Sequence, residues 1–151
     1  MTRRAQGIAV ALAVIVGIAL ASGGVVVLAG SGSEGASTGS VIVGTNGPDR
    51  LIGTNRHDVI DGRGGADLIR GRGGSDVLKG GTGRDEIAGG EKFDRLLGGP
   101  GDDTIRARDR HADTIECGAG RDVAWVDRIE DGVYDCKVVR TPGPSHAIPA
   151  R

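Results

Sequence analysis

Nine aspartates stand in register along the chain, and their carboxylates are the side chains best placed to do chemistry. Seven follow one another at intervals of nine residues, and the last two resume that interval after one extra residue: Asp49, Asp58, Asp67, Asp76, Asp85, Asp94 and Asp103, then Asp113 and Asp122. Such a short, fixed period indicates a solenoid in which every repeat forms the same turn. The carboxylates are therefore expected in columns, at the same point of successive coils.

Carboxylates in such a column repel one another unless a cation lies between them, because stacked strands are only about 4.8 Å apart. Calcium suits this spacing, since it is a hard ion that takes about 6 to 8 oxygen ligands and accepts backbone carbonyls as well as carboxylates. Magnesium requires a smaller octahedron and keeps its waters, so we expect it to compete poorly. The alternative is a metal-free solenoid in which aspartate, a residue favoured in turns, forms a hydrogen-bonded ladder.

Glycines and aliphatic residues around the aspartates provide the elements that would position them. Glycine recurs five and two residues before the aspartates, where it permits the positive φ angles of a tight turn. The residue two positions after the aspartate is expected to face the core of a short strand, while residues such as Val59 and Arg70 face outward. The predicted core residues are branched aliphatics of similar size: Leu51, Ile60, Ile69, Leu78, Ile87, Leu96, Ile105 and Ile115.

The unit G-G-x-G-x-D-x-U-x, with U aliphatic, resembles the nonapeptide of the hemolysin-type (RTX) calcium-binding repeat family. Residues 98–106 are one complete unit, and the resemblance extends over 44–106 and again over 117–125. It implies an all-β fold, a parallel β-roll (β-solenoid) that binds Ca²⁺ in its turns. In the family's roll one coil takes two units, so residues 18 apart would lie above one another. That arrangement places the aspartates on two edges, with Asp49, Asp67, Asp85 and Asp103 on the first and Asp58, Asp76 and Asp94 on the second.

Three turns depart from this pattern, and all three precede aspartates outside the first-edge set. Arg56 and Lys92 stand where glycine is expected two residues before Asp58 and Asp94, and the turn before Asp113 has neither glycine. A cation at that position removes the residue that tolerates positive φ and brings positive charge near a bound divalent ion. We therefore expect the first edge to bind calcium more tightly than the second.

The composition limits the other ways in which this chain can fold. Its 151 residues allow one modest domain, but they include 29 glycines and only three aromatic residues, Phe93, Trp125 and Tyr134. So little apolar material requires metal, disulfides or association for stable folding. A net charge of −1, with arginines scattered through the repeats, gives no reason to expect a nucleic-acid partner.

The N-terminus is predicted to direct export. Arg3 and Arg4 precede an apolar run over residues 8–21, and residues 19–21 fit a cleavage site before Ser22. The competing interpretation is an uncleaved anchor over 8–29, long enough to span a bilayer as a membrane tether. We therefore assign 1–29 to a signal peptide or N-terminal membrane anchor and 30–40 to a Gly/Ser linker. In both cases the location is extracellular, either secreted or anchored at the cell surface.

Two cysteines, Cys117 and Cys136, follow the main array. In an exported chain such a pair most simply forms a disulfide, although a reactive thiol pair is the alternative. The roll is assigned to residues 41–126, with a disulfide-closed C-terminal cap over 117–136 in which Trp125 covers the last coil. Residues 137–151, which contain three prolines, are predicted to be a disordered tail.

No catalytic constellation accompanies these repeats, so we do not expect an enzyme. His57 occupies a variable turn position, and His111 with Asp109 and Asp113 either holds a different metal or lies in a solvated turn. The serines lack a nucleophile elbow, and the glycine loops lack the phosphate-loop lysine. The prediction is an exported protein whose β-roll folds on binding calcium. The alternatives are an adhesive or structural cell-surface protein that presents the roll to a protein or cell-wall partner, and a hydrolase or toxin fragment, for which little sequence remains outside the repeats.

Overall fold

The computed structural model describes residues 26–29, 38–127 and 132–141. In these ranges the regular elements are thirteen β-strands, and no helix there is long and apolar enough to cross a membrane. The strands are β1 (Val26–Ala29), β2 (Thr38–Val43), β3 (Arg50–Ile52), β4 (His57–Asp61), β5 (Leu68–Gly73), β6 (Val77–Lys79), β7 (Glu86–Glu91), β8 (Arg95–Leu97), β9 (Thr104–Ala107), β10 (Thr114–Glu116), β11 (Val123–Val126), β12 (Gly132–Tyr134) and β13 (Val138–Arg140).

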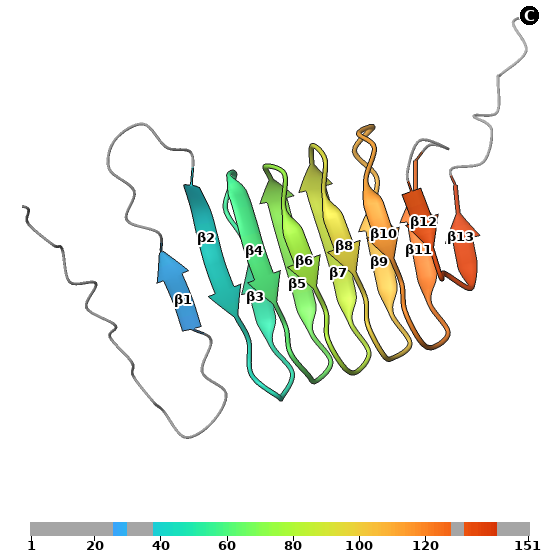
Figure 1. Cartoon of the computed structure of the whole chain (residues 1–151), viewed down its shortest axis with the longest axis horizontal. Helices are drawn as coiled ribbons and strands as arrows, with labels where there is room; N and C mark the ends of the chain where they lie inside the picture. The colour runs from blue at the N-terminus through green and yellow to red at the C-terminus, as the bar shows by residue number, and fades with distance from the viewer. Residues whose placement is uncertain (1–25, 30–37, 128–131, 142–151) are drawn as a thin grey trace, which may run out of the picture.

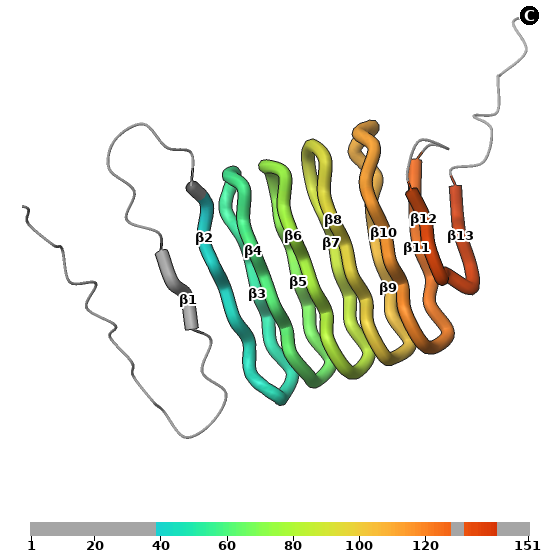
Figure 2. Tube along the Cα trace, viewed as in Figure 1, coloured from blue at the N-terminus to red at the C-terminus, as the bar shows by residue number. Residues whose placement is uncertain are grey.

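The strands form two sheets that the chain visits alternately, so that it winds as a solenoid (Figures 1 and 2). One sheet has the order β1-β2-β4-β6-β8-β10-β12, and the other has the order β3-β5-β7-β9-β11-β13. All pairings are parallel except that of β1 with β2. Leu51 pairs with Ile69, which pairs with Ile87, so one coil takes 18 residues, or two nonapeptide units. The predicted parallel β-roll is therefore confirmed.

The extra residue before Asp113 lengthens one coil without disturbing the register of the strands. Leu96 pairs with Ile115 and Ile105 pairs with Ala124, so both offsets across this coil are 19 residues. The insertion is taken up in the turn, where Arg110 adopts a φ of 73°. A turn absorbs an added residue more readily than a strand, because a one-residue slip in a strand would send its core side chains to the outer face.

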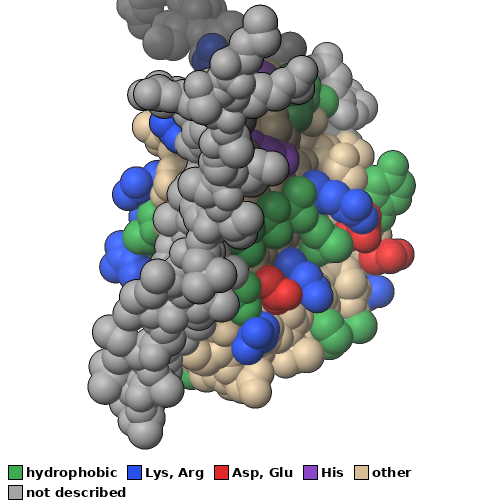
Figure 3. All heavy atoms as spheres, turned by 60° about the vertical axis from the view of Figure 1, so that its left-hand side comes forward, with side chains coloured by type: hydrophobic (Ala, Val, Ile, Leu, Met, Phe, Trp, Pro, Cys, Tyr) green, Lys and Arg blue, Asp and Glu red, His purple; other side chains and the backbone are tan. Residues whose placement is uncertain are grey.

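The core is a single stack of aliphatic side chains between the two sheets. Each of the eight predicted core residues has at most 1% of its side chain exposed, and Ile42, Ala107, Ala124 and Val126 extend the stack. Neighbouring residues point outward by the alternation of strands, as Val59 does with 40% exposed. Figure 3 shows the Lys and Arg side chains of the visible face in several separate groups.

At the N-terminal end, β1 pairs antiparallel with β2, with Val26 opposite Val43. These residues lie within the predicted signal peptide or anchor, whose remaining part, 1–25, is outside the described residues. β2 begins at Thr38, before residue 41, where the sequence placed the start of the roll. The backbone edge of β2 is thus covered by a strand from the apolar N-terminal segment.

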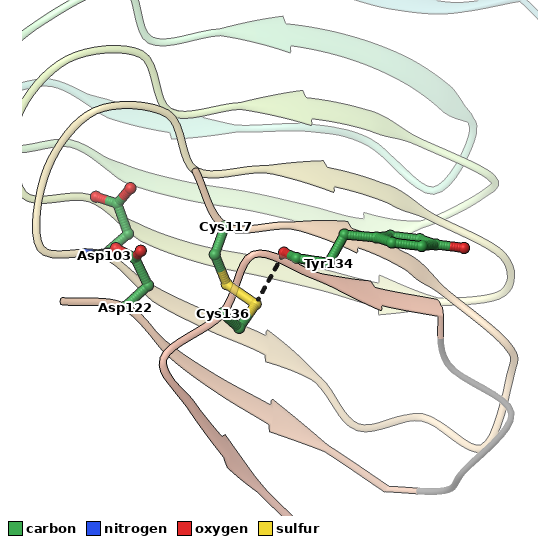
Figure 4. The surroundings of a disulfide bond; sticks show 5 residues. All are labelled: Asp103, Cys117, Asp122, Tyr134 and Cys136. Atoms are coloured by element: carbon green, nitrogen blue, oxygen red, sulfur yellow. Dashed lines mark hydrogen bonds between the residues drawn. A yellow bond between two sulfur atoms is a disulfide. The ribbon is translucent and has the colours of Figure 1, made fainter. Parts of the chain in front are cut away.

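At the C-terminal end, β12 and β13 add a short final coil, which a disulfide attaches to the rest. β12 pairs with β10, β13 pairs with β11, and Cys117 is bonded to Cys136 with their Cα atoms 5.0 Å apart (Figure 4). The predicted disulfide is therefore present. β13 falls in the segment predicted to be a disordered tail, of which residues 142–151 lie outside the described part.

The prediction that Trp125 covers the last coil is wrong. Strand alternation turns Ala124 and Val126 into the core, so Trp125 lies on the outer face of β11. There its ring stands between two guanidinium groups, with the Cζ atoms of Arg108 and Arg140 at 4.7 and 5.2 Å from the ring centroid. These are cation–π contacts. The end of the roll is instead closed by β12, β13 and the disulfide.

Candidate metal centre

The turns bring the nine predicted aspartates into two columns, one along each edge of the roll. Apart from Asp49, which is half-buried, these side chains are at most 4% exposed: Asp58, Asp67, Asp76, Asp85, Asp94, Asp103, Asp113 and Asp122. In seven of the nine aspartates the backbone N–H donates to Oδ1 of the aspartate one coil later, as from Asp67 to Asp85 at 2.9 Å and from Asp58 to Asp76 at 2.7 Å. The first edge continues to Asp122 and the second to Asp113.

The second carboxylate oxygen, Oδ2, is the unusual atom of these columns. It is buried without a hydrogen-bond partner in six aspartates: Asp67, Asp76, Asp85, Asp94, Asp103 and Asp122. A buried polar atom that loses water and gains no partner costs about 1 to 3 kcal/mol, and more when it carries charge. A repeated cost of this kind indicates that a positively charged ligand belongs beside these oxygens.

Backbone carbonyl oxygens from the next coil lie close to these carboxylates, on the side of the first glycine of each turn. A Cβ added to Gly62 would stand 2.4 Å from both Asp67 Oδ2 and the carbonyl oxygen of Gly80. At Gly71 the corresponding distances are 2.3 Å to Asp76 Oδ2 and 2.4 Å to the Gly89 carbonyl. Glycine is therefore required there, because any side chain would collide with both oxygens.

The same arrangement recurs further along the first edge. At Gly98 an added Cβ would stand 2.6 Å from Asp103 Oδ2 and 2.4 Å from the carbonyl oxygen of Cys117. Each pair consists of a carboxylate oxygen from one coil and a carbonyl oxygen from the next, which is the donor chemistry that calcium prefers. The residues present therefore fit calcium, and aspartates from one edge with glycine carbonyls of the adjacent coil would hold it.

Metal binding through side chains alone is not supported. Among the described residues, no group of three or more His, Cys, Asp or Glu side chains converges to hold an ion. The alternative site around His111 does not form: its Nδ1 pairs with Asp109 Oδ2 at 2.9 Å, and its ring meets Phe93 edge-on, with centroids 5.6 Å apart. Backbone carbonyls must therefore supply part of any coordination shell on the edges of the roll.

Burial raises the pKa of five column carboxyls, those of Asp67, Asp76, Asp85, Asp94 and Asp103. The main cause in each case is the loss of water on burial. The hydrogen bond that the carboxylate accepts from the aspartate N–H of the preceding coil lowers the pKa and partly opposes this effect. The pKa rises to about 6 for Asp76 and Asp103 and to about 8 for Asp94, where the neighbouring carboxylates of Asp113, Asp76 and Asp109 add to the effect. By contrast, the pKa of Asp102 is lowered, because its carboxylate accepts the backbone N–H of Arg121. The five column carboxylates with a raised pKa are thus ones whose buried charge lacks compensation.

The backbone of the turns corrects one expectation about the second edge. Lys92 adopts a φ of 83°, so the expectation that a cation in this position loses the positive-φ conformation is wrong for this turn. Sequence reasoning also overlooked a second positive-φ position, four residues before the aspartate. Arg63 and Arg72 occupy it with φ of 72° and 86°, and Gly81 occupies it with 107°. The doubled glycine of the repeat was the available signal for that position.

The first coil, which we define as residues 44–61, has a different kind of turn. Four residues before the aspartate it carries Thr45 or Thr54, and neither has a positive φ. The N–H and Oγ1 of Thr45 donate to Asp49 Oδ2 at 2.6 and 2.9 Å. Thr54 binds Asp58 Oδ2 in the same way, at 2.5 and 3.1 Å. Here Oδ2 is fully satisfied by the chain itself, and no sequence pattern had indicated this difference.

The comparison with known families agrees with the geometry. The family described as RTX calcium-binding nonapeptide repeat (4 copies) matches residues 43–78 and 79–109. Together the two matched segments span 67 of the 151 residues, and over them the chain is similar to RTX repeats. The matched ranges contain the aspartates from Asp49 to Asp103, whereas Asp113 and Asp122 lie beyond them. Neither the curated proteins nor the solved structures gave a significant match.

Proposed function

We propose that this chain is an exported calcium-binding protein whose RTX roll folds when calcium binds between its coils. The observation that carries the proposal is the buried Oδ2 atom, without a hydrogen-bond partner, in six aspartates of the two columns. When bound, calcium supplies positive charge and a coordination sphere of about 6 to 8 oxygens. Its binding free energy is then also folding free energy, since the sites do not exist in the unfolded chain.

The residues of the roll have separate parts in this proposal. From Asp67 onward Oδ1 fixes the preceding coil by accepting its aspartate N–H, and in Asp67, Asp76, Asp85 and Asp103 Oδ2 lies beside a carbonyl of the following coil. The glycine turns bring the carbonyls close enough because they carry no side chains. Without a cation, the same geometry holds carboxylates in a stack of repelling charges, and the small aliphatic core is poorly able to offset that repulsion.

A calcium titration of the purified chain tests the proposal. We expect little β-structure by circular dichroism in chelator, a cooperative gain of β-signal with calcium in the range of about 10⁻⁴ to 10⁻³ M, and a much smaller response to magnesium. A spectrum that stays the same between chelator and millimolar calcium would refute calcium-dependent folding. Isothermal titration of the same sample measures binding separately from folding.

The disulfide and the N-terminal segment support export. A structural disulfide such as Cys117–Cys136 persists in oxidising compartments outside the cytoplasm. Residues 26–29, when paired with β2, are not available to a membrane-spanning helix over 8–29, which favours cleavage before Ser22 and release. The mass of the exported protein tests this, because retention of residues 1–21 would contradict cleavage.

A further inference from the structure

The first coil contains the two column aspartates whose Oδ2 atoms accept hydrogen bonds from their own turns. Asp49 Oδ2 has two donors from Thr45, and Asp58 Oδ2 has two from Thr54. The carbonyl of the next coil is in place here too, since an added Cβ at Gly44 would stand 2.7 Å from both Asp49 Oδ2 and the Gly62 carbonyl oxygen. The two oxygens are therefore present as in later coils, but the carboxylate oxygen is already occupied.

The cause lies in the backbone of the residue four positions before the aspartate. In the turns before Asp67, Asp76, Asp85, Asp94 and Asp103 this residue has a positive φ. Its N–H can then bond elsewhere: those of Gly81 and Gly99 donate to the carbonyls of Gly98 and Cys117 at 3.0 and 2.9 Å. Thr45 and Thr54 do not have a positive φ, and their N–H groups donate to the carboxylate of their own turn. Threonine rarely adopts positive φ, so residue type and turn conformation agree.

We propose that Thr45 and Thr54 close the first two gaps of the roll to calcium, so that calcium binding begins at Asp67 and Asp76. A gap here is the space between equivalent turns of adjacent coils. This inference rests on the proposed function and refines it, because it divides the repeats into a metal-independent first coil and a metal-dependent remainder. For a cation to bind at Asp49 or Asp58, two donors would have to leave Oδ2 and the turn would have to change its conformation.

A role for the first coil follows from this division. A coil whose carboxylates are satisfied by its own chain needs no cation to remove an unpaired buried charge. It therefore offers β3 and β4 as ready edges on which β5 and β6 pair. Solenoids fold by propagation from one repeat to the next, and their terminal repeats are atypical. The threonine turns make the N-terminal repeat such an end, and only the later coils require calcium.

Counting bound calcium in substituted chains tests the inference. Native mass spectrometry and isothermal titration would compare the unsubstituted chain with Thr45→Gly/Thr54→Gly, in which Oδ2 loses the hydroxyl and the turn can take positive φ. We expect about one additional ion for each opened gap. Thr45→Ser/Thr54→Ser keeps the hydroxyls and should bind the original number. Thr82→Ala, at an exposed turn residue of a later coil, controls for loss of a threonine.

A second pair of variants keeps the test valid if glycine does not reopen the turns. Asp67→Asn/Asp76→Asn should bind about two fewer ions, whereas Asp49→Asn/Asp58→Asn should bind as many as the unsubstituted chain. Equal loss in the two double variants, with no gain from the glycine variant, would overturn the inference while leaving calcium binding itself intact. An unsubstituted chain that binds no calcium would overturn the proposed function as well, so the two failures are distinguishable.

Discussion

Two glycines on the first edge occupy the same place in their turns but have very different surroundings. Gly83 and Gly47 each stand two residues before a column aspartate. A Cβ on Gly83 would stand 1.8 Å from the carbonyl oxygen of Gly65, and its φ is +125°. A Cβ on Gly47 would have Thr45 Oγ1, at 3.8 Å, as its nearest neighbour, and its φ is not positive. Alanine at these two positions therefore tests whether close stacking of the turns holds the roll together.

We expect Gly83→Ala to be strongly destabilising. The left-handed backbone costs a residue with a Cβ about 1 to 2 kcal/mol. Because no heavy atoms approach to 1.8 Å, the two coils must also move apart, which weakens hydrogen bonds between them such as that from Gly65 N–H to the Thr82 carbonyl at 2.8 Å. At about 0.5 to 1.5 kcal/mol for each bond, one or two such losses bring the total to roughly 1.5 to 5 kcal/mol. That is a large share of the stability of a small domain.

Gly47→Ala should leave stability within about 0.5 kcal/mol or raise it slightly, because alanine restricts the unfolded chain and meets no obstacle in the folded one. Urea unfolding in saturating calcium measures both variants, and calcium titration in the absence of urea shows whether the folding midpoint moves. Equal losses in the two variants, or a Gly83→Ala protein as stable as the unsubstituted chain, would refute the argument. They would show that the carbonyl oxygen of Gly65 does not require a residue without a side chain at position 83.

Two further outcomes are expected. Cys117→Ser/Cys136→Ser should lower the free energy of unfolding by about 3 kcal/mol, because the disulfide closes a loop between residues 19 apart. The rate of amide hydrogen exchange should rise more in β10–β13 than in β5–β7. A uniform rise would contradict the role of the disulfide in closing the end of the roll. In chelator, the stability of the folded state should fall as pH rises from about 4 to about 8. Folding raises the pKa of Asp76 and Asp103 to about 6 and that of Asp94 to about 8. The folded state therefore binds these protons more tightly than the unfolded chain does, and the stability gained in this way is lost as the carboxyls ionise. A β-signal in chelator that grows with rising pH would contradict this sign.

The nine-residue period was sufficient to predict most of the fold. It identified the core from Leu51 to Ile115 because a solenoid repeats one environment, so that position in the unit determines burial. The two edge columns followed from the same period together with the family resemblance. The disulfide was predictable because two cysteines in an exported chain have few other partners.

Other features depended on three-dimensional contacts that the pattern does not contain. Threonine in place of the second glycine looks like ordinary variation in a turn. Only the folded structure shows that Thr45 and Thr54 donate hydrogen bonds to the aspartate Oδ2 atoms of their own turns. Lys92 shows that neighbouring coils can impose positive φ on a residue that disfavours it. Trp125 was misplaced because a solenoid needs an atypical end and the repeat pattern stops near this residue, whereas strand alternation places the ring on the outer face between two arginines.

The hydrogen bonds between column aspartates all run in one direction, from an N–H of one coil to a carboxylate of the next. The two ends of the roll are therefore not equivalent, either during folding or after truncation. Seven aspartate N–H groups donate to a carboxylate of the coil that comes after them in the sequence, as Asp85 N–H does to Asp103 Oδ1. When coils are added from the N-terminal end, the last complete coil therefore has aspartate N–H donors without acceptors until the next coil pairs with it. For these aspartates truncation is unequal: loss of a C-terminal coil leaves the aspartate N–H groups of the coil before it without their carboxylate acceptors, whereas loss of an N-terminal coil leaves aspartate Oδ1 atoms, which water or a cation can satisfy.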